Sequence, residues 1–271
     1  MTRESPLVVA HRGSSELEAE HTIVAYERAI DEGADALECD VRMTRDGHLI
    51  CVHDRRIDRT SNGRGVVSTF DLAALEEVDF GSWHARLPDT ADELIRQQLL
   101  DDRRSRATVL RFDDLLELIE AADRPVRLLV ETKHPTRYGG LVEQTLVDRL
   151  RWFGFAAPAR REDARVTMMS FSSLAVRRVR DLAPAVPTVQ LLERVPVVRR
   201  DGSLPRGASI AGPGIHILRA HPKYVRRVQE RGHPVYVWTV DDPADVELVL
   251  SLGVDAVITN RPGMVLRTLG R

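Results

Sequence analysis

Two acidic residues and a histidine lie close together in the stretch 36–54, which reads ALECDVRMTRDGHLICVHD. Side chains alternate in direction along a strand, so Glu38 and Asp40 share one face of a strand predicted here. Two carboxylates on one face raise each other's pKa unless a cation sits between them. The spacing therefore predicts a site for a hard cation, with His53 beside it as an acid/base group.

A predicted β-hairpin brings this histidine to the carboxylates. Asp46-Gly47 flanked by alternating residues is a strong signal for a tight turn between two strands. A two-residue loop places Asp40 across from His53, and a four-residue loop places Glu38 there instead. Cross-strand pairs share a face, so either register leaves the imidazole beside a carboxylate. The alternative interpretation is a surface hairpin with ordinary charges.

Other polar or aromatic residues follow predicted strands elsewhere in the chain: His11 and Arg12, Glu131 and Lys133, Ser170 and Phe171, Trp238, and Thr259 and Asn260. Three carboxylates from two strands suit Mg²⁺ or Ca²⁺ better than zinc, which favours nitrogen and sulfur ligands. Two histidines suit one general base and one general acid. Arg12 and Lys133 suit a phosphoryl oxyanion. This inventory is typical of a phosphodiesterase, although an ordinary ion pair remains the alternative for Glu131 and Lys133.

The elements that would position these residues alternate between strands and helices. Eight strands are predicted, at 7–10, in the first arm of 36–54, and at 126–131, 166–171, 188–192, 209–218, 234–240 and 254–259. Helices are predicted after Thr22 and at 72–78, 91–100, 112–121, 141–153, 174–182, 223–231, 243–252 and 262–269. Eight parallel strands joined by crossovers fit a (β/α)8 TIM barrel of one domain, 1–271. A doubly wound open sheet is the alternative, but no G-x-G-x-x-G follows a strand.

The segment 55–111 is less regular than the rest of the chain and is predicted to be a small insertion after the second-strand hairpin. It contains several glycines, Pro88, and a charged run at 101–106 that we interpret as a solvated loop. An excursion of this length between core elements usually has a function, such as covering a site.

Composition restricts the class of protein. The formal net charge is −2 over 271 residues, which gives no reason to expect nucleic acid or an anionic membrane as the main partner. No apolar run approaches the roughly 20 residues of a transmembrane helix, and no secretory signal is recognisable. Cys39 and Cys51 are expected to be buried free thiols, consistent with a reducing cytoplasm. Six further histidines are interpreted as surface or packing residues: His48, His84, His134, His216, His221 and His233.

Short motifs spread along the chain carry a family resemblance. They are AHRG at 10–13, the triplet at 20–22, ECDVRMTRDG at 38–47, VHD at 52–54, DRTSNGRG at 58–65, FGSW at 80–83, ETK at 131–133, SF at 170–171, VWTV at 237–240 and ITNRP at 258–262. In this order they resemble the glycerophosphodiester phosphodiesterase family, a (β/α)8 barrel with a small insertion after the VHD segment.

The resemblance implies a role for each candidate. His11 and His53 would be the catalytic pair, and Glu38, Asp40 and Glu131 would hold the ion. Arg12 and Lys133 would contact phosphate, while Phe171 and Trp238 would wall the alcohol pocket. One histidine would deprotonate the glycerol 2-hydroxyl or a water, and the other would protonate the departing alcohol. The substrate would be a small glycerophosphodiester, and the products glycerol 3-phosphate and an alcohol.

Two positions depart from the family pattern. His21 stands where the family usually has asparagine, which bears on ion coordination, and Asp241 replaces a common asparagine after VWTV. A negative charge near the alcohol pocket would favour a cationic head group. Alternatives on the same barrel are a lysophospholipase D-like enzyme, an enzyme that stops at a cyclic phosphate, and a non-catalytic phosphodiester-binding module.

Overall fold

The computed structural model describes residues 5–84 and 107–271. Its parallel strands are β1 (Leu7–His11), β2 (Ala36–Met43), β4 (Arg127–Thr132), β5 (Val166–Ser170), β6 (Thr188–Leu192), β7 (Ile210–Pro213), β8 (Tyr236–Val237) and β9 (Ala256–Thr259). They are hydrogen-bonded in the order β7-β6-β5-β4-β2-β1-β9-β8. Parallel bridges from Ala211 to Val235 and from Gly214 to Trp238 join the two ends of this order. The predicted (β/α)8 barrel is therefore confirmed.

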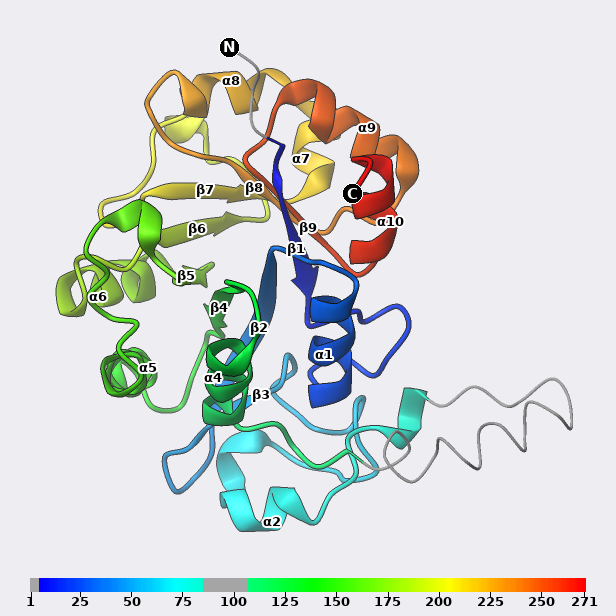
Figure 1. Cartoon of the computed structure of the whole chain (residues 1–271). Helices are drawn as coiled ribbons and strands as arrows, with labels where there is room; N and C mark the ends of the chain where they lie inside the picture. The colour runs from blue at the N-terminus through cyan, green and yellow to red at the C-terminus, as the bar shows by residue number, and fades with distance from the viewer. Residues whose placement is uncertain (1–4, 85–106) are drawn as a thin grey trace, which may run out of the picture.

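Helices surround the strands (Figure 1). They are α1 (Ile23–Asp31), α4 (Phe112–Ala121), α5 (Leu141–Trp152), α6 (Ser173–Leu182), α7 (Ile215–Ala220), α8 (Lys223–Gln229), α9 (Pro243–Leu252) and α10 (Pro262–Thr268). As predicted, the Thr22 side chain caps α1 by accepting a hydrogen bond from the Ala25 amide. Helix α9 begins with a proline and ends at Gly253, which adopts the left-handed conformation (φ 65°) common after helices.

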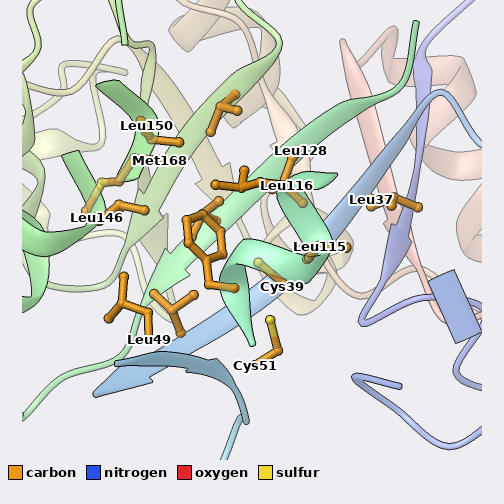
Figure 2. Packing of buried hydrophobic residues seen from close by; sticks show 14 of the residues in the cluster. Leu37, Cys39, Leu49, Cys51, Leu115, Leu116, Leu128, Leu146, Leu150 and Met168 are labelled. Carbon is orange, nitrogen blue, oxygen red and sulfur yellow. The ribbon is translucent and has the colours of Figure 1, made fainter. Parts of the chain in front are cut away.

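The core has two layers on either side of the barrel wall. Figure 2 shows the outer layer, in which Leu37 and Cys39 of β2 pack with Leu115 and Leu116 of α4. Fully burying one such leucine contributes roughly 1.5–3 kcal/mol to folding. The inner layer contains Val9, Ala36, Leu129, Met169, Val189, Leu191, Ile210, Ala256 and Ile258. Because outward-facing residues alternate with inward-facing ones, the packing of Leu37 and Cys39 against helices turns Glu38 and Asp40 into the barrel.

The hairpin register differs from both predictions. Strand β3 (Leu49–Cys51) pairs antiparallel with β2 so that Arg42 lies opposite Ile50, which leaves a three-residue loop at 45–47. Gly47 in this loop has a left-handed backbone (φ 91°), as three-residue hairpins often require. This register would direct His53 away from the carboxylates if the ladder continued. Instead the ladder ends at Cys51, and Arg42 holds the His53 carbonyl through two hydrogen bonds of 2.9 and 2.7 Å.

The described part of the insertion, 55–84 and 107–111, consists of short elements: η1 (Val67–Thr69), α2 (Leu72–Glu76) and η2 (Ser82–His84). They share an apolar cluster with the return arm of the hairpin: Ile50, Val52, Ile57, Val67, Leu72, Leu75, Phe80 and Val109. Figure 1 shows α2 at the opposite edge of the molecule from α8. The helix predicted at 91–100 and the charged run 101–106 lie outside the described residues.

Two predicted strands are shorter in the structure. The strand predicted at 209–218 ends at Pro213, and α7 follows from Ile215. Proline cannot donate a ladder hydrogen bond, and Ile215 and Leu218, three residues apart, are both buried on one face of the helix. The strand predicted at 234–240 is reduced to β8, Tyr236–Val237. Among the described residues, no helix has the length and apolar character needed to cross a bilayer.

Candidate active site

Strand register brings the predicted carboxylates together at the carboxyl ends of β1, β2 and β4. His11 lies beside Glu38 in the ladder, and Asp40 lies beside Glu131. One ligand atom from each of Glu38, Asp40 and Glu131 lies within 4.8 Å of the others. All three side chains are buried. Glu38 and Asp40, which alternation grouped, and Glu131, which its strand end added, therefore form a single group of oxygen atoms.

Two cations flank this cluster. The Lys133 ammonium lies 3.0 Å from Asp40 Oδ1 and 2.8 Å from Glu131 Oε2. Arg12 Nε lies 3.1 Å from Asp40 Oδ2, and the Arg12 amide donates to Glu38 Oε2 at 3.1 Å. Apart from its ion pair with Lys133, Asp40 Oδ1 has no hydrogen-bond partner among the described residues. Three buried carboxylates that converge on one point fit a hard divalent cation.

Charges at the cluster move the three carboxyl pKa values apart. Burial and the neighbouring Asp40 raise the pKa of Glu38 well above its usual value, and they raise the pKa of Glu131 to about 7. Burial opposes ionisation of Asp40 too, but Lys133, His21 and Arg12 hold its pKa well below the usual value. Asp40 is therefore the permanent negative charge at the centre of the site.

The turn after β1 is specified by its backbone. Arg12 adopts a left-handed conformation (φ 59°), which costs a non-glycine residue roughly 1–3 kcal/mol and is frequent at functional sites. Gly13 follows with φ 87°, and a Cβ there would lie 2.7 Å from backbone atoms of Ala25. The HRG sequence at 11–13 thus fixes a tight turn that directs the Arg12 side chain toward Asp40.

A hydrogen bond to Asn260 orients the imidazole of His11. Its Nδ1 lies 2.7 Å from Asn260 Oδ1, and the Asn260 amide nitrogen donates to Asp241 Oδ2 at 2.6 Å. Because the carboxylate requires a donor, the amide oxygen must face the histidine, so Nδ1 of His11 carries the proton. Nε2 is then a free base, 3.9 Å from Glu38 Oε2. Burial and the adjacent Arg12 lower the pKa of His11 to about 3.

His53 has a similar arrangement on the other flank of the cluster. Its Nδ1 lies 2.7 Å from Asp54 Oδ1, which can only accept, so its Nε2 is also a free base when the ring is neutral. Burial lowers the pKa of His53, and the positive charges of Lys133 and Arg12 add to this effect. A chain of ion pairs connects the two flanks: Arg12 to Glu20, Glu20 to Arg59, and Arg59 to Asp54.

These side chains line one pocket of about 310 Å³. Its lining includes His11, Arg12, Glu38, His53, Glu131, Lys133, Phe171 and Trp238, which is every predicted site residue except Asp40, buried beneath them. The rings of Phe171 and Trp238 meet edge to face with centroids 5.3 Å apart. They form the apolar side of the pocket, away from the carboxylates.

Several contacts were not identified from the sequence. Arg59 and Asp54 belong to the quoted motifs but gave no sign of linking the two histidine flanks. Asn260 was identified by its position at a strand end and by the ITNRP motif, without a role assigned to it. Asp241 accepts hydrogen bonds from Thr259 Oγ1, the Asn260 amide and Asn260 Nδ2. It does not line the pocket. The structure therefore gives no support to Asp241 as a selector of cationic head groups.

His21 is the other position that departs from the family pattern, and its side chain contacts Asp40 of the carboxylate cluster. It is buried, its Nε2 lies 3.0 Å from Asp40 Oδ2, and its Nδ1 lies 2.8 Å from the Tyr26 hydroxyl. The Tyr26 hydroxyl donates to the Glu38 carbonyl at 3.0 Å. The imidazole therefore connects Asp40 to the backbone of the same strand.

A family model described as the glycerophosphoryl diester phosphodiesterase family matches residues 11–264. The chain belongs to this family. It is 44% identical over 258 residues to "Probable glycerophosphodiester phosphodiesterase 1" of Mycobacterium tuberculosis, covering 95% of this chain and 90% of that protein. It is 33% identical to the glycerophosphodiester phosphodiesterase of Bacillus subtilis, covering 95% and 84%. The resemblance inferred from the motifs is thereby confirmed.

Solved structures agree on the fold of this glycerophosphoryl diester phosphodiesterase family member. A phosphodiesterase of Oleispira antarctica, in complex with the product sn-glycerol-3-phosphate, superposes with a TM-score of 0.82 at 21% identity and covers 98% of this chain and 97% of its own. The glycerophosphodiester phosphodiesterase of Agrobacterium tumefaciens gives 0.75 at 24%, covering 97% and 100%.

Proposed function

We propose that this protein is a metal-dependent glycerophosphodiester phosphodiesterase that releases glycerol 3-phosphate and an alcohol. The observation that carries the proposal is one pocket in which two imidazoles with free Nε2 atoms flank three buried carboxylates, with Arg12 and Lys133 beside them. Family membership and the names of the relatives support the same reaction. The relative from Oleispira antarctica holds sn-glycerol-3-phosphate, which is the product expected here.

Glu38, Asp40 and Glu131 would hold the divalent cation, Mg²⁺ or Ca²⁺. All three offer oxygen ligands, and Asp40 Oδ1 has no partner among the described residues besides its ion pair with Lys133. When bound, the ion would supply positive charge to the phosphoryl group as negative charge develops on it. Arg12 and Lys133 line the same pocket and would donate to phosphoryl oxygens, Arg12 through its fork and Lys133 as a point charge.

The two histidines divide the proton transfers. A neutral imidazole with a free Nε2 accepts the proton of the attacking hydroxyl, either the glycerol 2-hydroxyl or a water. The other histidine, after gaining a proton, donates it to the oxygen of the departing alcohol. The hydrogen bonds of Nδ1 to Asn260 in His11 and to Asp54 in His53 keep each Nε2 directed into the pocket. Phe171 and Trp238 would enclose the alcohol.

The test is a coupled assay of glycerol 3-phosphate released from glycerophosphocholine. We expect turnover in Mg²⁺ or Ca²⁺, loss of turnover in EDTA, and recovery when the ion is restored. Phosphorus NMR of the product separates complete hydrolysis from release of a cyclic phosphate. Faster turnover of lysophosphatidylcholine than of glycerophosphocholine would assign the enzyme to the lysophospholipase D class instead. Binding of glycerophosphocholine with no turnover under any ion would contradict the enzymatic proposal.

A further inference from the structure

A second cavity opens beside the catalytic pocket, on the side away from the carboxylates. Its volume is about 1090 Å³, and Glu193 lines both spaces. His216, which lines the larger cavity, donates from Nε2 to the Glu193 carbonyl at 2.7 Å. The His216 ring also packs against Trp238, with centroids 6.4 Å apart. The larger cavity therefore adjoins the Phe171–Trp238 side, where the alcohol of the substrate is proposed to lie.

Four cationic side chains line this second cavity: Arg194, Arg200, Lys223 and Arg227. Within the described chain, none of them has a carboxylate at ion-pair distance. Two neighbouring arginines outside the lining do have carboxylate partners. Arg226 pairs with Glu230 at 3.3 Å, and Arg231 pairs with Asp201. Glu193 is the acidic residue of the lining, so the cavity has an excess of positive charge facing the alcohol side of the pocket.

Tyr224 provides an independent sign that the cavity binds a polar group. The residue is only 2% exposed, yet its hydroxyl has no hydrogen-bond partner among the described residues. Buried polar groups are almost always paired, and an unpaired one requires an explanation. Tyr224 lines the cavity together with Val195, Val197, Ile217 and Ala220. The cavity thus combines four cations and an apolar wall, and the unpaired Tyr224 hydroxyl is covered by the residues around it.

We propose that this cavity is a subsite for an anionic group carried by the leaving alcohol. The inference rests on the proposed function, because it assumes that the alcohol side of the substrate points toward Trp238. The cations attract the anion and the apolar wall contacts its carbon frame. A shift of the lining that uncovers the Tyr224 hydroxyl would let it donate to one of the anion's oxygens. Glycerophosphodiesters of a phosphorylated alcohol should then be preferred over those of choline, whose positive charge the same cations repel.

The test compares two substrates that differ by one phosphate, glycerophosphoinositol 4-phosphate and glycerophosphoinositol, with the metal-loaded enzyme. We expect the ratio of their kcat/KM values to exceed ten in the wild type. The ratio should fall at least fivefold in Lys223→Met, Arg227→Met and Tyr224→Phe. Arg226→Met is the matched control on the same helix, and it should keep the wild-type ratio. A wild-type ratio near one, or cavity variants that match the control, would overturn the subsite.

A binding measurement keeps this proposal separate from the proposed function. Calorimetry with inositol 4-phosphate should show binding to the wild type and to Arg226→Met, and tenfold or greater weakening in Lys223→Met and Arg227→Met. If no glycerophosphodiester is hydrolysed but this pattern holds, the proposed function fails and the anion site stands. If inorganic phosphate binds with the same dependence while the ratio of kcat/KM values stays near one, the cavity binds a free anion and the substrate subsite is wrong.

Discussion

The candidate active-site pocket and the cavity beside it both have Glu193 in their lining, but their cationic side chains are paired differently. In the pocket, Lys133 has carboxylate oxygens at 2.8 and 3.0 Å, and Arg12 has them at 3.0 and 3.1 Å. In the cavity, four cations line the surface without a carboxylate at ion-pair distance among the described residues. The cations of the first region are paired with carboxylates of the protein. Those of the second have no carboxylate partner in the described part of the chain, although Arg227 donates to the Arg200 carbonyl at 3.0 Å.

Burial explains the difference. The Lys133 side chain is 11% exposed, and a cation held there without a partner would lose its hydration without compensation. Lys223 is exposed, so water satisfies its charge when no ligand is present. The pocket therefore has its geometry fixed before the substrate binds, as catalysis requires. In the cavity, water surrounds the cations until an anion replaces it. Tyr224 is the exception in the cavity, because it is buried and unpaired.

The largest expected effect lies in the pocket. His11→Ala and His53→Ala should each lower kcat for glycerophosphocholine by about 10²–10⁴-fold, the usual contribution of one general acid or base. Folding should be intact by circular dichroism, and the surface variant Arg226→Met should keep wild-type turnover. Near-normal kcat in either histidine variant would remove that residue from the mechanism and place the chemistry elsewhere in the pocket.

A pair of lysine variants compares a buried lysine that has carboxylate partners, Lys133, with an exposed lysine that has none among the described residues, Lys223. Lys133→Met should lower the free energy of unfolding by about 3 kcal/mol in EDTA, because buried Glu131 would lose its cation and buried Asp40 would keep only Arg12. Saturating Mg²⁺ or Ca²⁺ should restore part of the loss by supplying positive charge. Lys223→Met should stay within about 0.5 kcal/mol of the wild type. Urea unfolding with and without metal measures both, and equal losses would contradict the contrast.

The sequence predicted the pocket far better than the cavity. Alternation in β2 grouped Glu38 with Asp40. The rule that barrel sites lie at strand ends made Glu131 and Lys133 candidates, and the family resemblance favoured them over an ordinary ion pair. His53 was placed near them for the wrong reason, since the hairpin register depends on a three-residue loop and the histidine reaches the pocket through a bend after Cys51.

The cavity could not be predicted because no part of its lining has a chemical pattern of its own. Its residues come from the segments 193–200 and 216–227, which meet only after the chain folds. His216 and His221 were interpreted as surface or packing residues, and the start of α7 was predicted as strand. An unpaired hydroxyl is a property of three-dimensional packing, so nothing in the sequence distinguishes Tyr224 from an ordinary core tyrosine.

The pH dependence of stability tests whether the Tyr224 hydroxyl is shielded from water in the folded protein. Burial raises its pKa to about 12, above the usual value near 10. Between these values the unfolded chain ionises and the folded chain does not, so the unfolding free energy should fall as pH rises from 10 to 12. The loss attributable to this residue is roughly 2 kcal/mol near pH 11.5. Urea unfolding of metal-free wild type and Tyr224→Phe at pH 9 and pH 11.5 should show a smaller loss in the variant; equal losses would mean that the hydroxyl is solvated.

The smallest expected effect concerns the hydrogen bonds that orient His11. They run from its Nδ1 to Asn260 and from Asn260 to Asp241. Asn260 accepts from Nδ1 of His11, and Asp241 fixes the orientation of the Asn260 amide. Asn260→Ala removes the acceptor that keeps the proton on Nδ1, so a fraction of the rings should carry it on Nε2, where it blocks base catalysis. We expect kcat to fall about tenfold, equivalent to about 1.4 kcal/mol, with KM nearly unchanged. Asp241→Asn should cause a smaller fall in kcat, because the amide keeps its place but loses its charged partner. A change in KM alone, or a loss of thermal stability with normal kcat, would show that Asn260 serves the fold and does not position the histidine.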